Sequence, residues 1–145
     1  MQQEYDDGGR RASGTPYTSR DCVARSIAIA TSLPYRTVCD GLNEIAKSER
    51  RGKRKRGISS DENGVYKYTT RRYLKSLGWV WTPTMHFGSG CKVHLRSREL
   101  PKGRLVVSLS KHVTAVIDGV IHDTHDPSRD GNRCVYGYWT VAPLD

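Results

Sequence analysis

The segment from His112 to Asp123 holds two residues that could do chemistry together, an imidazole and a carboxylate on either side of a tight turn. Asp118-Gly119 is a strong signal for a two-residue hairpin loop, and the runs on both sides are rich in β-branched residues. Such a loop sets Thr114 opposite Asp123. Because side chains alternate between the two faces of a strand, His112 and Asp123 then share a face as diagonal neighbours, roughly 7–8 Å apart. A carboxylate at that place can orient the imidazole and stabilise its cation.

A cysteine at position 22 supplies a third reactive group. Residues 22–31 are apolar on almost every side, with Arg25 and Ser26 as the only strongly polar interruptions, which favours a buried helix. Asp21 precedes it at a natural N-cap position. The N–H groups and the dipole of a helix N-terminus favour a thiolate, and a nearby imidazolium favours it further. Cys22 is therefore a candidate nucleophile for acyl transfer, and its backbone N–H could donate to a developing oxyanion.

The order of these groups resembles that of papain-like cysteine peptidases, especially the small bacterial and phage members. The motifs that carry the resemblance are Asp21-Cys22 ahead of an apolar helix and the pattern H-x-x-A-V-x-D-G-x-x-x-D over residues 112–123. The resemblance implies that Cys22 is the nucleophile, His112 the general base and acid, and Asp123 the orienting carboxylate. It further implies a peptide or protein substrate, cleavage of a peptide or isopeptide bond, and no cofactor. Amidase, transglutaminase-like and acetyltransferase chemistry use the same three groups.

One position departs from the family pattern. Many papain-like enzymes carry a glutamine about six residues before the nucleophile as an oxyanion donor, and Pro16 stands there in this chain. Thr18 and Ser19 are the nearby substitutes, although they would make a weaker oxyanion hole. The departure leaves a second hypothesis open, a catalytically degenerate papain-like module that binds nucleic acid or an acidic protein through its basic surface.

The charge of the chain favours an acidic partner. The 24 basic and 15 acidic residues give a net charge of +9. Residues at about 48–63 are expected to form a mobile basic loop, since this segment is too charged to bury. Six of its residues are candidate contacts for nucleic acid or an acidic protein: Arg50, Arg51, Lys53, Arg54, Lys55 and Arg56. The tryptophans at 79, 81 and 139 lie in strand patterns and are expected in the core rather than on a base-stacking surface.

The sequence predicts an α+β fold in one domain. Residues 1–16 are expected to be a flexible polar arm, and residues 17–145 a single papain-like domain. Helices are predicted at 22–31, 34–47 and about 69–77. Strands of an antiparallel sheet are predicted at 79–82, 104–109, 112–117, 119–124 and 134–141, with a loop and one irregular strand between 84 and 103.

The four cysteines are expected to be free thiols in a cytoplasmic protein, because no pair has C-x-x-C spacing and the chain opens on a polar segment. No apolar run approaches the roughly 20 residues of a membrane-spanning helix, so no membrane association is expected. No metal site is expected either. His122 should point to the opposite face of its strand from His125, and the grouping of Cys91, His94 and Cys134 is weak.

Overall fold

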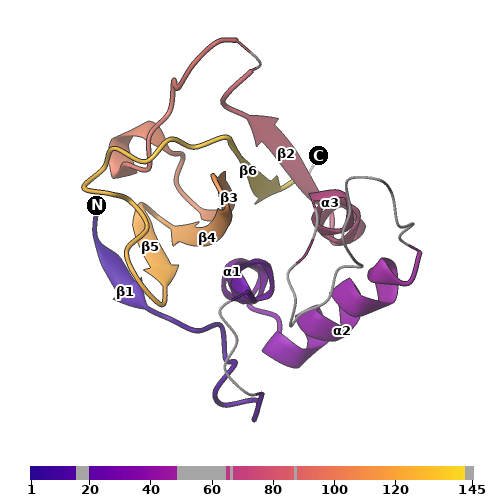
Figure 1. The fold of residues 1–145 in the computed structure, drawn as a ribbon. Coiled ribbons are helices and arrows are strands. Elements are labelled where there is room, and N and C mark those ends of the chain that lie inside the picture. Colours follow the sequence, from indigo (N-terminus) through magenta and orange to yellow (C-terminus); the bar gives the residue numbers. More distant parts are fainter. Residues whose placement is uncertain (16–19, 49–64, 66, 87, 143–145) are drawn as a thin grey trace.

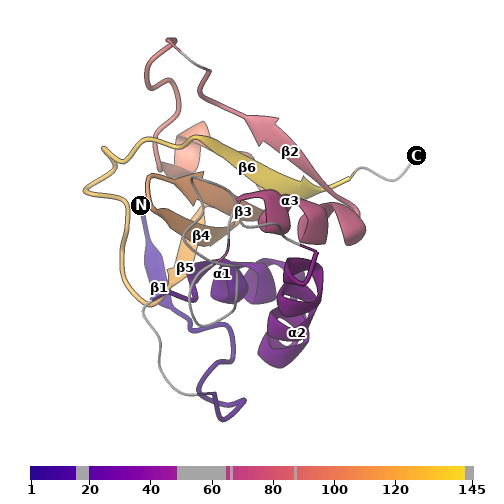
Figure 2. The same ribbon diagram turned by 45° about the vertical axis from the view of Figure 1, so that its right-hand side comes forward.

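Three helices lie against one six-stranded mixed sheet in the computed structural model (Figures 1 and 2). The structure describes residues 1–15, 20–48, 65, 67–86 and 88–142. The helices are α1 (Cys22–Thr31), α2 (Tyr35–Ala46) and α3 (Lys67–Ser76), with a 3-10 turn η1 (Ser97–Glu99). The strands are β1 (Gln3–Tyr5), β2 (Trp79–Pro83), β3 (Arg104–Leu109), β4 (His112–Ile117), β5 (Val120–Asp123) and β6 (Gly137–Val141). Their order across the sheet is β1-β5-β4-β3-β6-β2, and the α+β class is as the sequence predicts.

The β4–β5 hairpin has the register that the sequence predicts. Val116 pairs with Ile121, and the two turn residues Asp118 and Gly119 have φ angles of 49° and 81°. Two consecutive positive φ angles are the signature of the two-residue loop that suits the twist of a hairpin. This loop fixes which side chains of the two strands share a face.

The sheet is buried on both faces. Helix α1 covers one face, where Ile27 packs in a core with Val106 and Ala115 (Figure 1). A second core on the other face contains Val107 and Val116 and is closed by the loops before β3 and β6. Central strand β3 therefore buries consecutive residues, as strands covered on both faces do.

Helices α2 and α3 extend the first core beyond the edge of the sheet, with α3 next to β2 (Figure 2). The two helices approach closely at Gly41, where a Cβ atom would collide with the Tyr73 ring. Gly78 follows α3 with a φ of 83°, the left-handed conformation in which a glycine commonly ends a helix. All three predicted helices are present, with ends within two residues of the prediction.

The N-terminal segment differs from the expected flexible arm, because residues 3–5 are a strand of the sheet. Strand β1 pairs in parallel with β5, so the prediction of a purely antiparallel sheet is also wrong. The sequence Gln-Glu-Tyr has no apolar alternation, and Tyr5 is largely exposed. Backbone hydrogen bonds at a sheet edge hold this strand, and they leave no hydrophobic pattern in the sequence.

The prediction of four free thiols is wrong for Cys91 and Cys134, which form a disulfide. Their Cα atoms are 5.8 Å apart although 43 positions separate them in the chain. Backbone pairing in an isolated antiparallel β-bridge between His94 and Cys134 brings the two segments side by side. The spacing of the cysteines in the sequence does not reveal such a contact. The cysteines therefore give no support to a cytoplasmic location. Cys22 and Cys39 are not part of a disulfide. No helix among the described residues is long and apolar enough to cross a membrane.

Candidate active site

Cys22 is the first residue of α1, as the sequence predicts, and it lies beside the start of β4. One turn further along the helix, the Ser26 hydroxyl donates a hydrogen bond of 2.9 Å to the carbonyl of Val113. This bond joins the helix that carries Cys22 to the strand that carries His112. The Cys22 thiol and the His112 ring lie close enough together for each to shift the pKa of the other.

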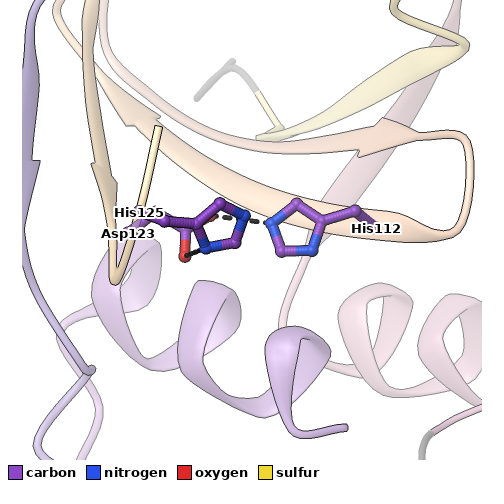
Figure 3. A group of neighbouring side chains, drawn as sticks. All are labelled: His112, Asp123 and His125. Atoms are coloured by element: carbon purple, nitrogen blue, oxygen red, sulfur yellow. Dashed lines mark hydrogen bonds and ion pairs between the residues drawn. The ribbon is translucent and has the colours of Figure 1, made fainter. Parts of the chain in front are cut away.

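His112 and Asp123 are in direct contact. The Nε2 atom of His112 lies 2.8 Å from Oδ2 of Asp123, and Figure 3 shows the ring turned toward the carboxylate. The hairpin register places them as diagonal neighbours, as the sequence predicts. Because Nε2 bonds the carboxylate, Nδ1 is left for the thiol of Cys22. The imidazole thus lies between an acid group and a thiol.

The pKa shifts of the three groups favour an ion pair. Burial opposes charge on His112, but its hydrogen bonds to Asp123 and Cys22 outweigh burial and raise the pKa of the imidazole from 6.5 to about 9. Burial likewise opposes the Cys22 thiolate. The pKa of the thiol is nevertheless lowered. The causes are the hydrogen bond and charge of His112, then a hydrogen bond from the Val113 backbone and the charge of Arg25. Burial also opposes the negative charge of Asp123, but hydrogen bonds from His112 and Thr114 outweigh it and lower the pKa of this carboxyl group. Both shifts in the Cys22–His112 pair favour thiolate and imidazolium.

Asp123 is held by donors on both carboxylate oxygens. Oδ2 accepts a second hydrogen bond, of 2.7 Å, from the hydroxyl of fully buried Thr114. Oδ1 accepts from the backbone N–H of Thr124 at 2.7 Å. The Asp123 carbonyl accepts from the Gln3 side chain at 2.9 Å and from the Asp6 N–H at 3.0 Å. The N-terminal segment therefore takes part in fixing this residue.

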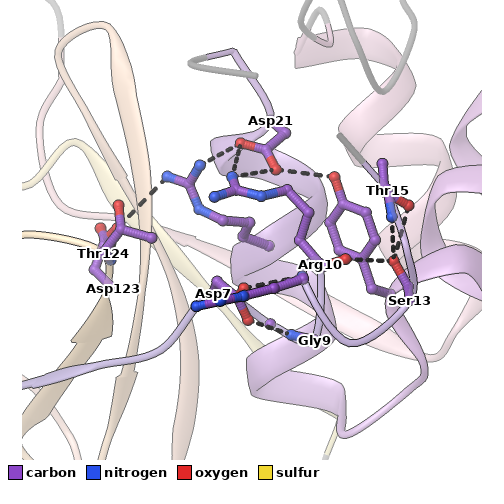
Figure 4. Close-up of polar contacts among 12 residues, drawn as sticks. Asp7, Gly9, Arg10, Ser13, Thr15, Asp21, Asp123 and Thr124 are labelled. Carbon is purple, nitrogen blue, oxygen red and sulfur yellow. Dashed lines mark hydrogen bonds and ion pairs between the residues drawn. The ribbon is translucent and has the colours of Figure 1, made fainter. Parts of the chain in front are cut away.

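A chain of buried charges continues from Asp123 to the N-terminal segment (Figure 4). Arg25 lies with Nη2 3.6 Å from Oδ1 of Asp123 and forms an ion pair with Asp21. Asp21 also accepts hydrogen bonds from Arg10 at 3.0 Å and from the Tyr35 hydroxyl at 2.9 Å. Asp21 precedes α1 as predicted, but its carboxylate makes no capping hydrogen bond, because these three side chains occupy it. Positive and negative groups alternate along this chain, so each buried charge has a partner.

A cleft of about 610 Å³ opens in front of Cys22 and His112. The starts of α1 and β4 form one end, α3 forms a wall, and side chains of β2, β3 and β6 form the floor. Trp81 and Trp139 meet in this floor with ring centroids 5.3 Å apart. Trp139 is buried in the first core as expected, whereas Trp81 is only partly buried and lines the cleft. The volume is in the range of ligand-binding sites.

A third histidine stands next to the His112–Asp123 pair. The ring of His125 is 5.0 Å from that of His112, and its Nδ1 is 3.8 Å from Oδ1 of Asp123 (Figure 3). One potential ligand atom of each of these three residues lies within 4.8 Å of the others. However, Nε2 of His112 and Oδ2 of Asp123 already bond each other, and the guanidinium of Arg25 near the carboxylate would repel a cation. This geometry suits a hydrogen-bonded pair better than a metal site.

The remaining predicted site residues lie outside the described residues. These are the candidate oxyanion donors Thr18 and Ser19 and the basic residues Arg50, Arg51, Lys53, Arg54, Lys55 and Arg56.

Sequence reasoning missed the polar residues that support the site, although α1 carried a signal for two of them. Arg25 and Ser26 follow Cys22 by three and four positions in a helix whose other residues are mostly buried and apolar. A polar group in such a helix needs a partner, which marks both residues as contacts of a neighbouring element. No pattern in the sequence marks Arg10 as buried, because only the folded structure shows that it pairs with Asp21.

Comparison of the chain with protein-family models, curated proteins and solved structures finds no match. The papain-like resemblance therefore rests on the residues of the chain alone.

Proposed function

We propose that the protein is a cysteine-dependent hydrolase or acyl-transfer enzyme that acts on a peptide or isopeptide bond through Cys22, His112 and Asp123. The observation that carries the proposal is the position of His112, which contacts Asp123 at 2.8 Å and lies next to the Cys22 thiol at the end of a cleft. A thiol with a lowered pKa beside a protonated imidazole is an activated nucleophile combined with a proton donor.

In the first half of the reaction, the thiolate of Cys22 attacks the carbonyl carbon of the substrate and forms a C–S bond. The negative charge moves to the carbonyl oxygen, where the backbone N–H of Cys22 at the start of α1 can donate to it. When the C–N bond breaks, the imidazolium of His112 gives its proton to the leaving amine. A thioester on Cys22 and a neutral His112 remain.

In the second half, water or an acceptor amine attacks the thioester, and His112 takes the proton of the attacking group. Breakage of the C–S bond returns the thiolate, so the ion pair is restored. Asp123 keeps Nε2 of the ring occupied throughout, and Nδ1 thereby stays directed at the reacting atoms.

A test of this proposal compares the wild-type protein with Cys22→Ala on fluorogenic peptide libraries and on isopeptide-linked substrates. We expect turnover by the wild-type protein and none by Cys22→Ala, together with an unchanged circular dichroism spectrum. Cys39→Ala is the matched control because Cys39 is the other cysteine outside the disulfide and lies buried in α2, away from the residues that line the cleft. Equal turnover by Cys22→Ala and the wild-type protein would end the proposal, as would loss of turnover only in Cys39→Ala.

A further inference from the structure

We propose that the cleft binds an acidic peptide segment that carries a bulky apolar side chain next to the reacting bond. The inference rests on the proposed function, because it names the substrate class for the same cleft. It rests on two independent features, the charges on the rim and the aromatic side chains of the floor.

Basic side chains surround the cleft. Lys67 and Arg71 project from α3 one turn apart, Lys111 directly precedes His112, and Arg20 lies two positions before Cys22. All four residues are exposed, and among the described residues that line the cleft there is no carboxylate. Positive side chains therefore lie at the end of the cleft that holds the nucleophile and along the α3 wall. Such a cleft concentrates anionic ligands and repels cationic ones.

The floor of the cleft is apolar. Trp81, Val106 and Trp139 come from three neighbouring strands, and Val113 lies beside His112. The Trp81 ring lies against Gly137, where a Cβ atom would collide with it, so the absence of a side chain at this position lets the ring approach β6 closely. An aromatic or branched aliphatic side chain of the substrate fits this floor, while acidic neighbours reach the rim.

A nucleic acid fits the same cleft less well. Base stacking needs an open aromatic face, and Trp139 is only 6% exposed and already in contact with Trp81. The aromatic side chains lie in the floor rather than between the cations on the rim. Both features favour a peptide over a nucleic acid. An oligonucleotide is therefore included in the test as the alternative ligand.

The experiment measures binding and turnover separately. Binding is measured by fluorescence anisotropy on the full-length Cys22→Ala protein. The labelled peptides have one sequence with a central phenylalanine and differ only in flanking glutamates, glutamines or lysines. Single-stranded DNA of equal charge is the fourth ligand. Arg71→Glu is the test variant. Arg98→Glu is the matched control, since it makes the same charge change at an exposed site on η1, outside the cleft.

We expect the glutamate peptide to bind at least about tenfold more tightly than the glutamine peptide. Arg71→Glu should remove that preference, and Arg98→Glu should retain it. Equal affinity for the two peptides, equal losses in both variants, or tighter binding of DNA than of the glutamate peptide overturns the inference.

Turnover by the protein with Cys22 intact separates this inference from the proposed function. Charge-selective binding without turnover contradicts the proposed enzymatic function and supports an acidic peptide as the ligand. Turnover with the same kcat/KM for glutamate and glutamine peptides supports the proposed enzymatic function and contradicts the inferred preference for an acidic substrate.

Discussion

Replacing Asp123 by asparagine should lower the pKa of His112 from about 9 toward its ordinary value of 6.5 while the ring stays in place. The rise from 6.5 to about 9 corresponds to roughly 3 kcal/mol in favour of the imidazolium, and the hydrogen bond to Asp123 is the largest favourable cause. Asparagine can still accept from Thr114 but carries no charge. Cys22 still raises the pKa of His112 in this variant, but the largest favourable cause is lost, and burial opposes the charge on the ring more effectively.

The expected change in charge is large near neutral pH. With a pKa of about 9, His112 is about 97% protonated at about pH 7.5, and with a pKa of 6.5 it is about 10% protonated. The titration can be followed in the carbon-edited NMR signals of the five histidines, with the His112 signal assigned from a His112→Gln variant. Asp40→Asn is the control, because Asp40 is exposed on α2 and pairs with Arg36.

Two results would refute this reasoning. One is a wild-type His112 that titrates near 6.5, since the two hydrogen bonds would then fail to outweigh burial. The other is an Asp123→Asn variant whose His112 titrates as in the wild-type protein, since the carboxylate would then have no influence on the ring.

Three further predictions concern the reaction, the supporting charges and the disulfide. The kcat/KM of the proposed reaction should rise with pH as Cys22 ionises below its ordinary pKa and should fall at about pH 9 as His112 loses its proton; a rate that still rises above that pH contradicts the ion pair. Arg25→Gln should move the ionisation of Cys22, measured as alkylation rate against pH, to higher pH, and Arg25→Lys should restore part of the shift. A purely structural role of Arg25 would slow alkylation at every pH without moving the midpoint. Replacing Cys91 and Cys134 together by serine should lower the free energy of unfolding in urea by about 4 kcal/mol, because the bond closes a long loop, and should leave Cys22 alkylation unchanged; a loss below about 1 kcal/mol contradicts this estimate.

Much of the site could be predicted because its signals are local. The Asp118-Gly119 turn sets the register of the hairpin, and that register alone brings His112 to Asp123. Likewise, the apolar run after Asp21 predicts the helix that begins at Cys22. Neither prediction needs information about distant parts of the chain.

The supporting structure could not be predicted because it depends on pairings between distant segments. Strand β1 is held by backbone hydrogen bonds to β5, about 120 positions away, and has no apolar pattern of its own. Arg10 is buried only because Asp21 lies beside it in the folded protein, and a buried ion pair leaves no periodic signal. The Cys91–Cys134 disulfide depends in the same way on two loops that lie side by side in the folded protein.

The central claim, an ion pair between Cys22 and His112, can be tested by alkylation with iodoacetamide between about pH 5 and 9. The rate at each cysteine is read by mass spectrometry in the wild-type protein and in His112→Ala, with a short, uncharged cysteine peptide as the reference thiol of pKa about 8.5. We predict that Cys22 of the wild-type protein reacts fast well below the pH at which the reference thiol ionises, and that His112→Ala loses this advantage. If Cys22 follows the reference thiol in both proteins, there is no ion pair, and the proposed reaction has no activated nucleophile.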